Sequence, residues 1–221
     1  MSPPPAERLS IAGPAGALQV VVEDPGPPAA TPQAFAVVCH PHPLHGGTMD
    51  NKVVTTLART FHELGLPTLR FNFRGVGTSE GTHDAGRGEV DDALAVLAHG
   101  RERWPGAAPW LAGFSFGGRI ALAAAARPEA GRVAQLVTIA PAFTRYHASP
   151  VTLRVPGCPW LIVMGDADEL IPAAEVTGFI EQLAPRPDCV LLPGVGHFFH
   201  GSLPLLRDTI HARVDAAPSR S

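Results

Sequence analysis

The sequence predicts one α/β domain with a mostly parallel central sheet flanked by helices. Short apolar runs with the length of buried strands alternate with stretches rich in helix formers. A length of 221 residues suits one such domain, and a hydrophobic content of 45% excludes a disordered chain. Because no repeat or linker divides the sequence, we expect a single domain over residues 1–221, with flexible tails at 1–7 and 215–221.

The predicted strands follow one another in a regular order. Leu18–Glu23 alternates apolar and polar residues, and we expect it to pair with Leu9–Ile11 as an antiparallel hairpin at one edge of the sheet. Six further apolar runs are typical of buried strands: Phe35–Cys39, Thr68–Phe73, Trp110–Ala112, Gln135–Ala140, Trp160–Met164 and Cys189–Leu192. Together they predict the central sheet.

A serine between two glycines separates a strand-like run from a helix-like run. The segment Gly113-Phe-Ser-Phe-Gly117 lies between the apolar run Ala108–Ala112 and the helix-forming run Arg119–Arg127. A serine at positive φ on such a turn brings the residues two before and two after it together, so only very small side chains fit there. A glycine-rich turn with a helix-capping serine is the alternative. The flanking strand and helix favour a nucleophile elbow at Ser115, which implies covalent catalysis.

A serine nucleophile needs a general base and a group that orients the base. Asp168 follows the apolar run Trp160–Met164, and His197 follows the run Cys189–Leu192. The residues therefore occur in the order serine, aspartate, histidine, each just after a predicted strand. This is the order of the triad in α/β hydrolases.

The chain resembles the α/β-hydrolase superfamily over nearly its whole length. The resemblance rests on His40-Pro-His42, on Asn72–Ser79, on the elbow, on Gly165-x-x-Asp-x-x-x-Pro172 and on Gly196-His197. The chain is most similar to a small single-domain bacterial branch in which His-Pro-His-Pro precedes Gly46–Lys52. The resemblance implies a serine hydrolase, which would cleave a carboxylic ester or thioester through an acyl-enzyme on Ser115, with His197 as base and Asp168 as the orienting acid. Amide and peptide substrates remain alternatives.

The superfamily pattern also implies an oxyanion hole made of two backbone N–H groups. The first belongs to Phe116, the residue after the nucleophile. The superfamily commonly has His-Gly-x after the third strand, but Pro41 occupies the glycine position here and has no N–H, so the matching amide is that of His42. The amides of Leu44 and of the glycines at 46 and 47 remain alternatives.

Other residues compete for the roles of acid and base. Asp166 and Glu169 share the turn of Asp168, which we favour because it is in register with the superfamily pattern. His200 is an alternative to His197, but the glycine-rich turn before His197 matches the superfamily better.

Two other functions compete with serine hydrolysis. His40, His42 and His45 are close enough in sequence to bind zinc, which suggests a metal-dependent hydrolase. The intervening prolines stiffen this segment and no adjacent Asp, Cys or Glu completes a familiar ligand spacing, so we expect no metal and no other cofactor. A binding protein that has lost its chemistry is the second alternative, and the complete set of three catalytic residue types argues against it.

The segment from Ala142 to Cys158 contains Pro150 and Pro156 and predicts a loop instead of a cap domain. Without a cap, the pocket is expected to be open and shallow and to favour short acyl groups. Phe114, Phe198 and Phe199 are expected to form its apolar walls, with core packing as the alternative role of Phe114.

Arg74 belongs to a segment that is similar to the Arg-Gly-x-Gly-x-Ser turn of the superfamily. A dinucleotide-binding fingerprint is excluded, because Glu80 stands where that motif requires glycine. We expect Arg74 to form a structural ion pair with Asp91 or Glu89 on the following helix.

Charge and targeting patterns limit the partners. A net charge of −3 without a basic cluster argues against nucleic acid, and neither a signal peptide nor a membrane-spanning run is recognisable. Three cysteines do not suggest a disulfide framework. We therefore expect a cytoplasmic protein whose partner is a small-molecule acyl substrate.

Overall fold

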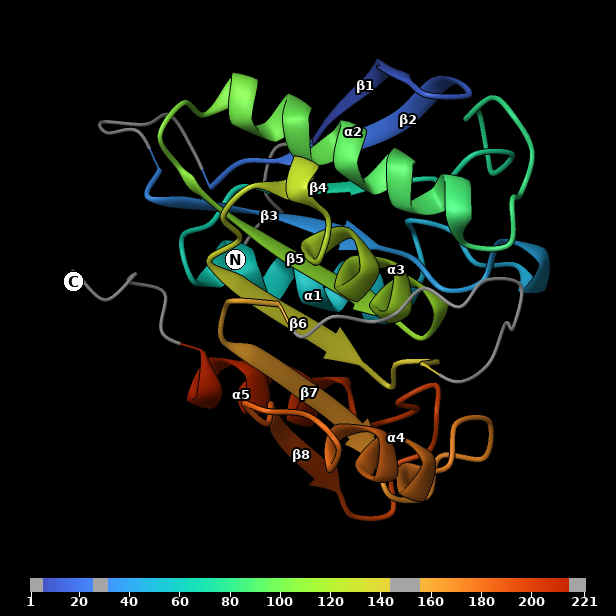
Figure 1. Ribbon diagram of the computed structural model, residues 1–221, viewed down its shortest axis with the longest axis vertical. Helices are drawn as coiled ribbons and strands as arrows, with labels where there is room; N and C mark the ends of the chain where they lie inside the picture. Colours follow the sequence, from blue (N-terminus) through green and yellow to red (C-terminus); the bar gives the residue numbers. More distant parts are fainter. Residues whose placement is uncertain (1–5, 26–31, 144–155, 215–221) are drawn as a thin grey trace.

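A single twisted sheet runs through the middle of the molecule (Figure 1). The computed structural model describes residues 6–25, 32–143 and 156–214. Across the sheet, the described strands lie in the order β1-β2-β4-β3-β5-β6-β7-β8. Their bounds are β1 Ala6–Gly13, β2 Gly16–Glu23, β3 Ala34–Cys39, β4 Thr68–Phe71, β5 Ala108–Phe114, β6 Gln135–Ile139, β7 Trp160–Gly165 and β8 Asp188–Leu192. From β4 to β8 all neighbours are parallel, whereas β2 is antiparallel to both β1 and β4.

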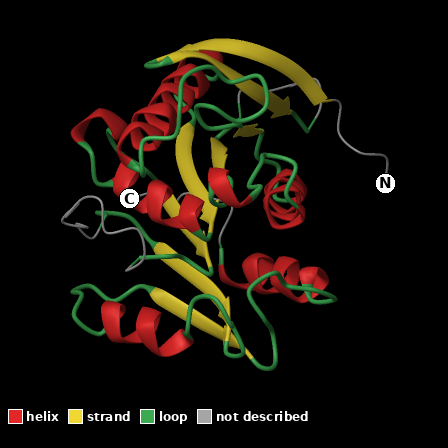
Figure 2. Cartoon of the chain, turned by 90° about the vertical axis from the view of Figure 1, so that its right-hand side faces the viewer, coloured by secondary structure: helices red, strands yellow, loops and turns green. Residues whose placement is uncertain are grey.

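Helices cover both faces of this sheet, as the alternating sequence pattern predicted. They are α1 Lys52–Glu63, α2 Arg87–Arg103, α3 Phe116–Ala125, α4 Ala173–Ile180 and α5 Leu203–Arg213. Figures 1 and 2 show α2, α3 and α4 on one face and α1 with α5 on the other. Within the described ranges, no helix is long and apolar enough to cross a bilayer.

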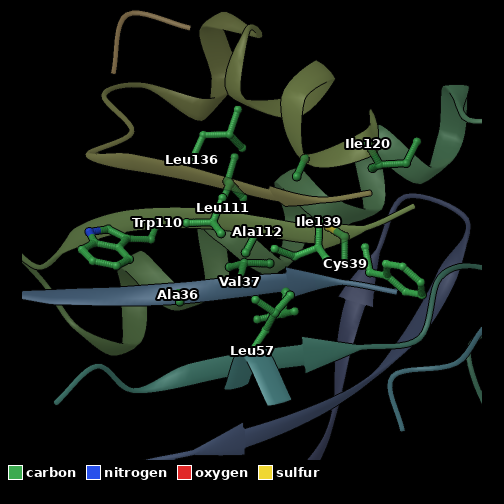
Figure 3. Close-up of a cluster of buried hydrophobic side chains, with 14 of the residues drawn as sticks. Ala36, Val37, Cys39, Leu57, Trp110, Leu111, Ala112, Ile120, Leu136 and Ile139 are labelled. Atoms are coloured by element: carbon green, nitrogen blue, oxygen red, sulfur yellow. The ribbon is translucent and has the colours of Figure 1, made fainter. Parts of the chain in front are cut away.

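The central strands are buried over almost their whole length because helices pack on both of their faces. Every residue of β3 and β7 is buried. Figure 3 shows the resulting core, in which side chains of β3, β5 and β6 lie between Leu57 of α1 and Ile120 of α3. This core holds the carboxyl ends of the parallel strands in fixed positions.

The N-terminal hairpin is confirmed, and it is longer than the sequence indicated. Leu9 faces Val20 and Ile11 faces Leu18, but the pairing extends from Ala6 to Gly13. Residues 6 and 7 are therefore part of a strand and not of a flexible tail. The rest of the predicted tails, 1–5 and 215–221, lies outside the described residues.

The ion pair predicted for Arg74 involves a different carboxylate. Nη2 of Arg74 lies 2.7 Å from Oδ1 of Asp92, and the backbone N–H of Arg74 donates to Oδ2 of the same residue at 3.0 Å. The prediction of Asp91 or Glu89 was wrong, because α2 turns Asp91 outward, toward Arg127, and because Glu89 binds the loop before the helix. The side chain of Asp92 is completely buried.

Replacing Asp92 with alanine is expected to lower the free energy of unfolding by about 3–5 kcal/mol, because the buried guanidinium of Arg74 loses its carboxylate. Urea denaturation followed by circular dichroism measures the change. Asp91→Ala is the matched control and should change the same quantity by less than about 0.5 kcal/mol. Equal effects of the two substitutions would show that the buried ion pair does not stabilise the fold.

Candidate active site

Ser115 lies on a strained turn between β5 and α3. Its φ of 55° and ψ of −116° agree with the positive φ expected of an elbow. A Cβ atom at Gly113 would collide with the carbonyl oxygen of Gly117, and a Cβ atom at Gly117 would collide with carbonyl oxygens at the end of β3. The two glycines therefore allow α3 to approach the strands closely enough to present the serine hydroxyl at the sheet edge.

Three side chains from different loops meet at this edge. Oγ of Ser115 lies 3.1 Å from Nε2 of His197, and Nδ1 of His197 lies 2.8 Å from Oδ2 of Asp168. All three side chains are buried. The arrangement allows a proton to pass from the hydroxyl to the imidazole while the carboxylate holds the opposite ring nitrogen.

The second oxygen of Asp168 is also engaged. Oδ1 accepts the backbone N–H groups of Leu170 and Ile171 at 2.9 and 2.7 Å. These two bonds fix the rotation of the carboxylate and leave Oδ2 directed at the imidazole. The two neighbouring carboxylates point elsewhere.

Asp166 accepts the N–H of Gly194 and is exposed, so it stabilises the turn against the loop after β8. Glu169 accepts the backbone N–H of His197 at 3.1 Å. Backbone N–H groups, first its own and then that of His197, lower the pKa of Glu169. Of the three candidates for the acid, only Asp168 contacts the imidazole of His197 within the described part of the chain.

The alternative base, His200, is turned away from the serine. Its Nδ1 lies 2.8 Å from Nζ of Lys52, at the start of α1. His197 is the histidine that the structure brings to Ser115.

The phenylalanines near the site have different roles. The ring of Phe114 is buried and packs on the imidazole of His197, with ring centroids 5.0 Å apart. Phe199 was predicted as a pocket wall, but its ring is completely buried behind Phe114, at a centroid distance of 6.4 Å. Phe198 is 40% exposed and lies at the pocket. Two adjacent apolar residues on a turn point in opposite directions, and the sequence does not indicate which one faces the core.

A pocket of about 350 Å³ opens beside Ser115 and His197. One wall comes from the loop after β3 and the start of α1, with Pro41, His45 and Asn51. The other wall comes from Leu170, Ile171 and Phe198. Leu170 and Ile171 were not predicted as pocket residues, although their place two and three residues after Asp168 was the available signal.

Several backbone N–H groups of the loop after β3 form hydrogen bonds within the loop. Leu44 donates to Nδ1 of His42 at 3.2 Å, Gly46 donates to the carbonyl of Pro43 at 3.2 Å, and Gly47 donates to the carbonyl of His42 at 3.0 Å. The three alternative oxyanion donors are thus held by acceptors within the loop.

His40 fixes the beginning of this loop. Its Nδ1–H donates to the carbonyl of Pro41 at 2.6 Å, and its Nε2 accepts the backbone N–H of Phe73 at 3.0 Å. Burial lowers the pKa of His40 to about 4, which keeps the ring neutral. The carbonyl of Pro41 and the N–H of His42 belong to the same peptide group. In a trans peptide these two groups point in opposite directions, so the hydrogen bond from His40 to the carbonyl also sets the direction of the His42 N–H.

The histidine cluster does not provide a set of metal ligands. Both ring nitrogens of His40 already have partners, and Nδ1 of His42 accepts the N–H of Leu44. Burial, followed by the nearby imidazoles of His83 and His45, lowers the pKa of His42 to about 4. Throughout the described ranges, no group of three or more His, Cys, Asp or Glu side chains is arranged to hold a metal ion.

A protein-family model described as serine aminopeptidase, S33, a hydrolase family, matches residues 36–157. This match covers more than half of the chain and includes the elbow. The chain belongs to this family. The hydrolase is also 36% identical over 180 residues to an uncharacterized protein of Rickettsia prowazekii, a match that covers 77% of this chain and 74% of the other.

Solved structures confirm that this hydrolase has the fold of α/β serine hydrolases. An α/β serine hydrolase homologue from Coxiella burnetii is 45% identical, with a TM-score of 0.84 over 95% of this chain and 97% of that chain. An α/β serine hydrolase without a lid from Xanthomonas campestris is 41% identical, with a TM-score of 0.86 over 99% of both chains. In the present hydrolase, most of the segment where the sequence predicts a loop instead of a cap, residues 144–155, lies outside the described residues.

Proposed function

We propose that this hydrolase cleaves carboxylic esters or thioesters with short acyl groups, through an acyl-enzyme on Ser115. The observation that supports the proposal most strongly is the chain of contacts from Ser115 through His197 to Asp168, which opens onto the pocket. The binding alternative gives no reason for three buried polar side chains at these distances.

In the proposed acylation step, Oγ of Ser115 attacks the carbonyl carbon while Nε2 of His197 takes the hydroxyl proton. Asp168 holds the proton on Nδ1 and stabilises the imidazolium that forms. The protonated imidazole then gives its proton to the leaving alcohol or thiol as the bond to the acyl carbon breaks. Water repeats the sequence in the second step, and the carboxylic acid leaves with Ser115 restored.

The amides of Phe116 and His42 would stabilise the oxyanion in both steps. Phe116 is the first residue of α3, where the helix dipole favours negative charge. The peptide that carries the His42 amide is oriented by His40 through the carbonyl of Pro41. Both donors are thus preorganised before the substrate binds.

The size of the pocket leads to a prediction about the acyl group. A volume of about 350 Å³ is near the lower end of ligand pockets, which hold about 300–1,000 Å³. We expect kcat/KM to be highest for acetyl and butyryl esters and to fall for octanoyl and longer chains. A p-nitrophenyl ester series from acetyl to lauroyl, run in parallel with the corresponding acyl-thioesters, measures this preference.

A preference for the long chains would contradict the proposed size limit. Hydrolysis that stops in the presence of a chelator would favour the metal-dependent alternative. A folded sample that hydrolyses none of the esters or thioesters would favour the binding alternative.

A further inference from the structure

Three aromatic side chains from separate parts of the chain pack together beside the proposed oxyanion hole. His42 follows β3, His83 lies in the loop before α2, and Phe116 begins α3. Ring centroids are 4.8 Å apart for His42 and Phe116, 4.9 Å for His42 and His83, and 5.8 Å for His83 and Phe116. We call these residues the aromatic triplet. Two of its members, His42 and Phe116, carry the proposed oxyanion amides. The ring of His83 contacts the rings of both residues.

A buried carboxylate lies against the ring of His83. Oε1 of Glu89, whose side chain is completely buried, lies 2.7 Å from Nδ1 of His83, at the distance of an ion pair but without the alignment of a hydrogen bond. The same carboxylate accepts the backbone N–H groups of Asp84 at 2.9 Å and of Gly86 at 2.8 Å. It cannot rotate without losing these bonds, so the ring of His83 lies beside a fixed carboxylate at the start of α2.

The loop that carries His42 is contacted by His40 and by His83. Its middle is open to solvent, with Leu44 72% exposed and His45 and Gly46 exposed as well. His40 holds the inner side of the loop through the Pro41 carbonyl. The ring of His83 contacts the imidazole of His42 directly.

We infer that His83, packed against His42 and Phe116, is a positioning residue that holds the His42 side chain against Phe116 and thereby fixes the spacing of the two oxyanion amides. This inference rests on the proposed function. Oxyanion contacts form fully only in the transition state, so a misplaced amide lowers kcat and leaves KM nearly unchanged. Loss of one donor costs about 10²–10³ in kcat, and a displaced donor costs less.

The experiment compares two substitutions of His83 in the full chain. His83→Ala removes the ring and should lower kcat on a short-chain p-nitrophenyl ester about tenfold, with KM within about twofold of the wild type. The dissociation constant of a short alkyl boronic acid, whose tetrahedral adduct occupies the oxyanion hole, should rise by the same factor. His83→Phe keeps the ring contact with His42 and should restore most of the lost kcat.

A second His–Glu pair provides the matched control. Nε2 of His211 on α5 lies 2.9 Å from Oε2 of Glu63, at the opposite end of α1 from the pocket. His211→Ala should leave kcat and boronic acid affinity unchanged. Glu89 is unsuitable for the test because it also binds the loop at the start of α2.

The outcomes separate this inference from the proposed function. A wild-type protein with no turnover and no reaction with a fluorophosphonate probe overturns both. An active wild type whose His83→Ala variant keeps its kcat and its boronic acid affinity overturns the inference alone. The inference is also overturned if kcat of His83→Ala falls only as much as the fraction of protein that the fluorophosphonate probe labels. His83 would then affect folding and not the position of the amides.

Discussion

Replacing Ser115 with alanine is expected to lower kcat on a short-chain p-nitrophenyl ester by about 10⁶-fold, because the atom that forms the acyl-enzyme is removed. His197 and Asp168 keep their mutual contact in this variant, but the imidazole has no hydroxyl from which to take a proton. Initial rates measure the loss. A fluorophosphonate probe, which reacts covalently with an activated serine, should label the wild type and not the variant.

The fold of the Ser115→Ala variant is expected to be unchanged, since alanine adds no atom and has the same backbone preferences at this turn. Melting temperature and circular dichroism check this point. Ser202→Ala is a matched control, because Ser202 precedes α5 and makes no side-chain capping bond there. It should retain full turnover and labelling. If the Ser115→Ala variant still hydrolysed the ester and a chelator stopped that activity, the result would contradict the serine mechanism and favour metal-dependent hydrolysis.

Much of the fold was predictable because its signals are local. Strands buried on both faces need continuous apolar runs, and β3, β6 and β7 lie within one residue of the runs predicted for them. The elbow was predictable for the same reason, since the strained turn at Ser115 requires small residues at fixed spacing. Parallel strands bring their carboxyl ends to one edge, which explains why residues far apart in sequence meet there.

Features that depend on packing were not predictable in this way. The partner of Arg74 is decided by which side of α2 faces the loop after β4, and the charge pattern alone does not distinguish three acidic residues within one turn of a helix. Similarly, Phe199 has a φ of 51° and points into the core, whereas Phe198 faces the pocket. Only the tertiary contacts of this turn determine which of the two rings is buried.

The turn after β7 that carries Asp168 was predictable from the sequence, but the role of each of its carboxylates depends on packing. Its sequence contains Asp166, Asp168 and Glu169, and local pattern alone does not choose among them. In the structure each carboxylate binds a different group: Asp166 binds the N–H of Gly194, Glu169 binds the N–H of His197, and Asp168 binds the imidazole. The three substitutions should therefore have very different effects on turnover.

Asp168→Asn is expected to lower kcat by about 10⁴-fold with little change in stability. The asparagine oxygen can still accept the N–H groups of Leu170 and Ile171, so the turn is kept. Its NH₂ group, however, faces Nδ1 of His197, where it donates and thereby moves the ring proton to Nε2. An imidazole protonated at Nε2 cannot accept the proton of Ser115. Steady-state kinetics and thermal melts of the variant measure the two effects.

Asp166→Asn is the matched control, because the asparagine oxygen can also accept the N–H of Gly194 and the residue does not contact His197. It should keep kcat within about twofold of the wild type, the range expected for an exposed side chain away from the reacting atoms. The opposite pair of results, an inactive Asp166→Asn and an active Asp168→Asn, would contradict the mechanism and show that Asp166 orients the imidazole. Equal losses in both variants would mean that the conformation of the turn, and not the tautomer of His197, controls the rate.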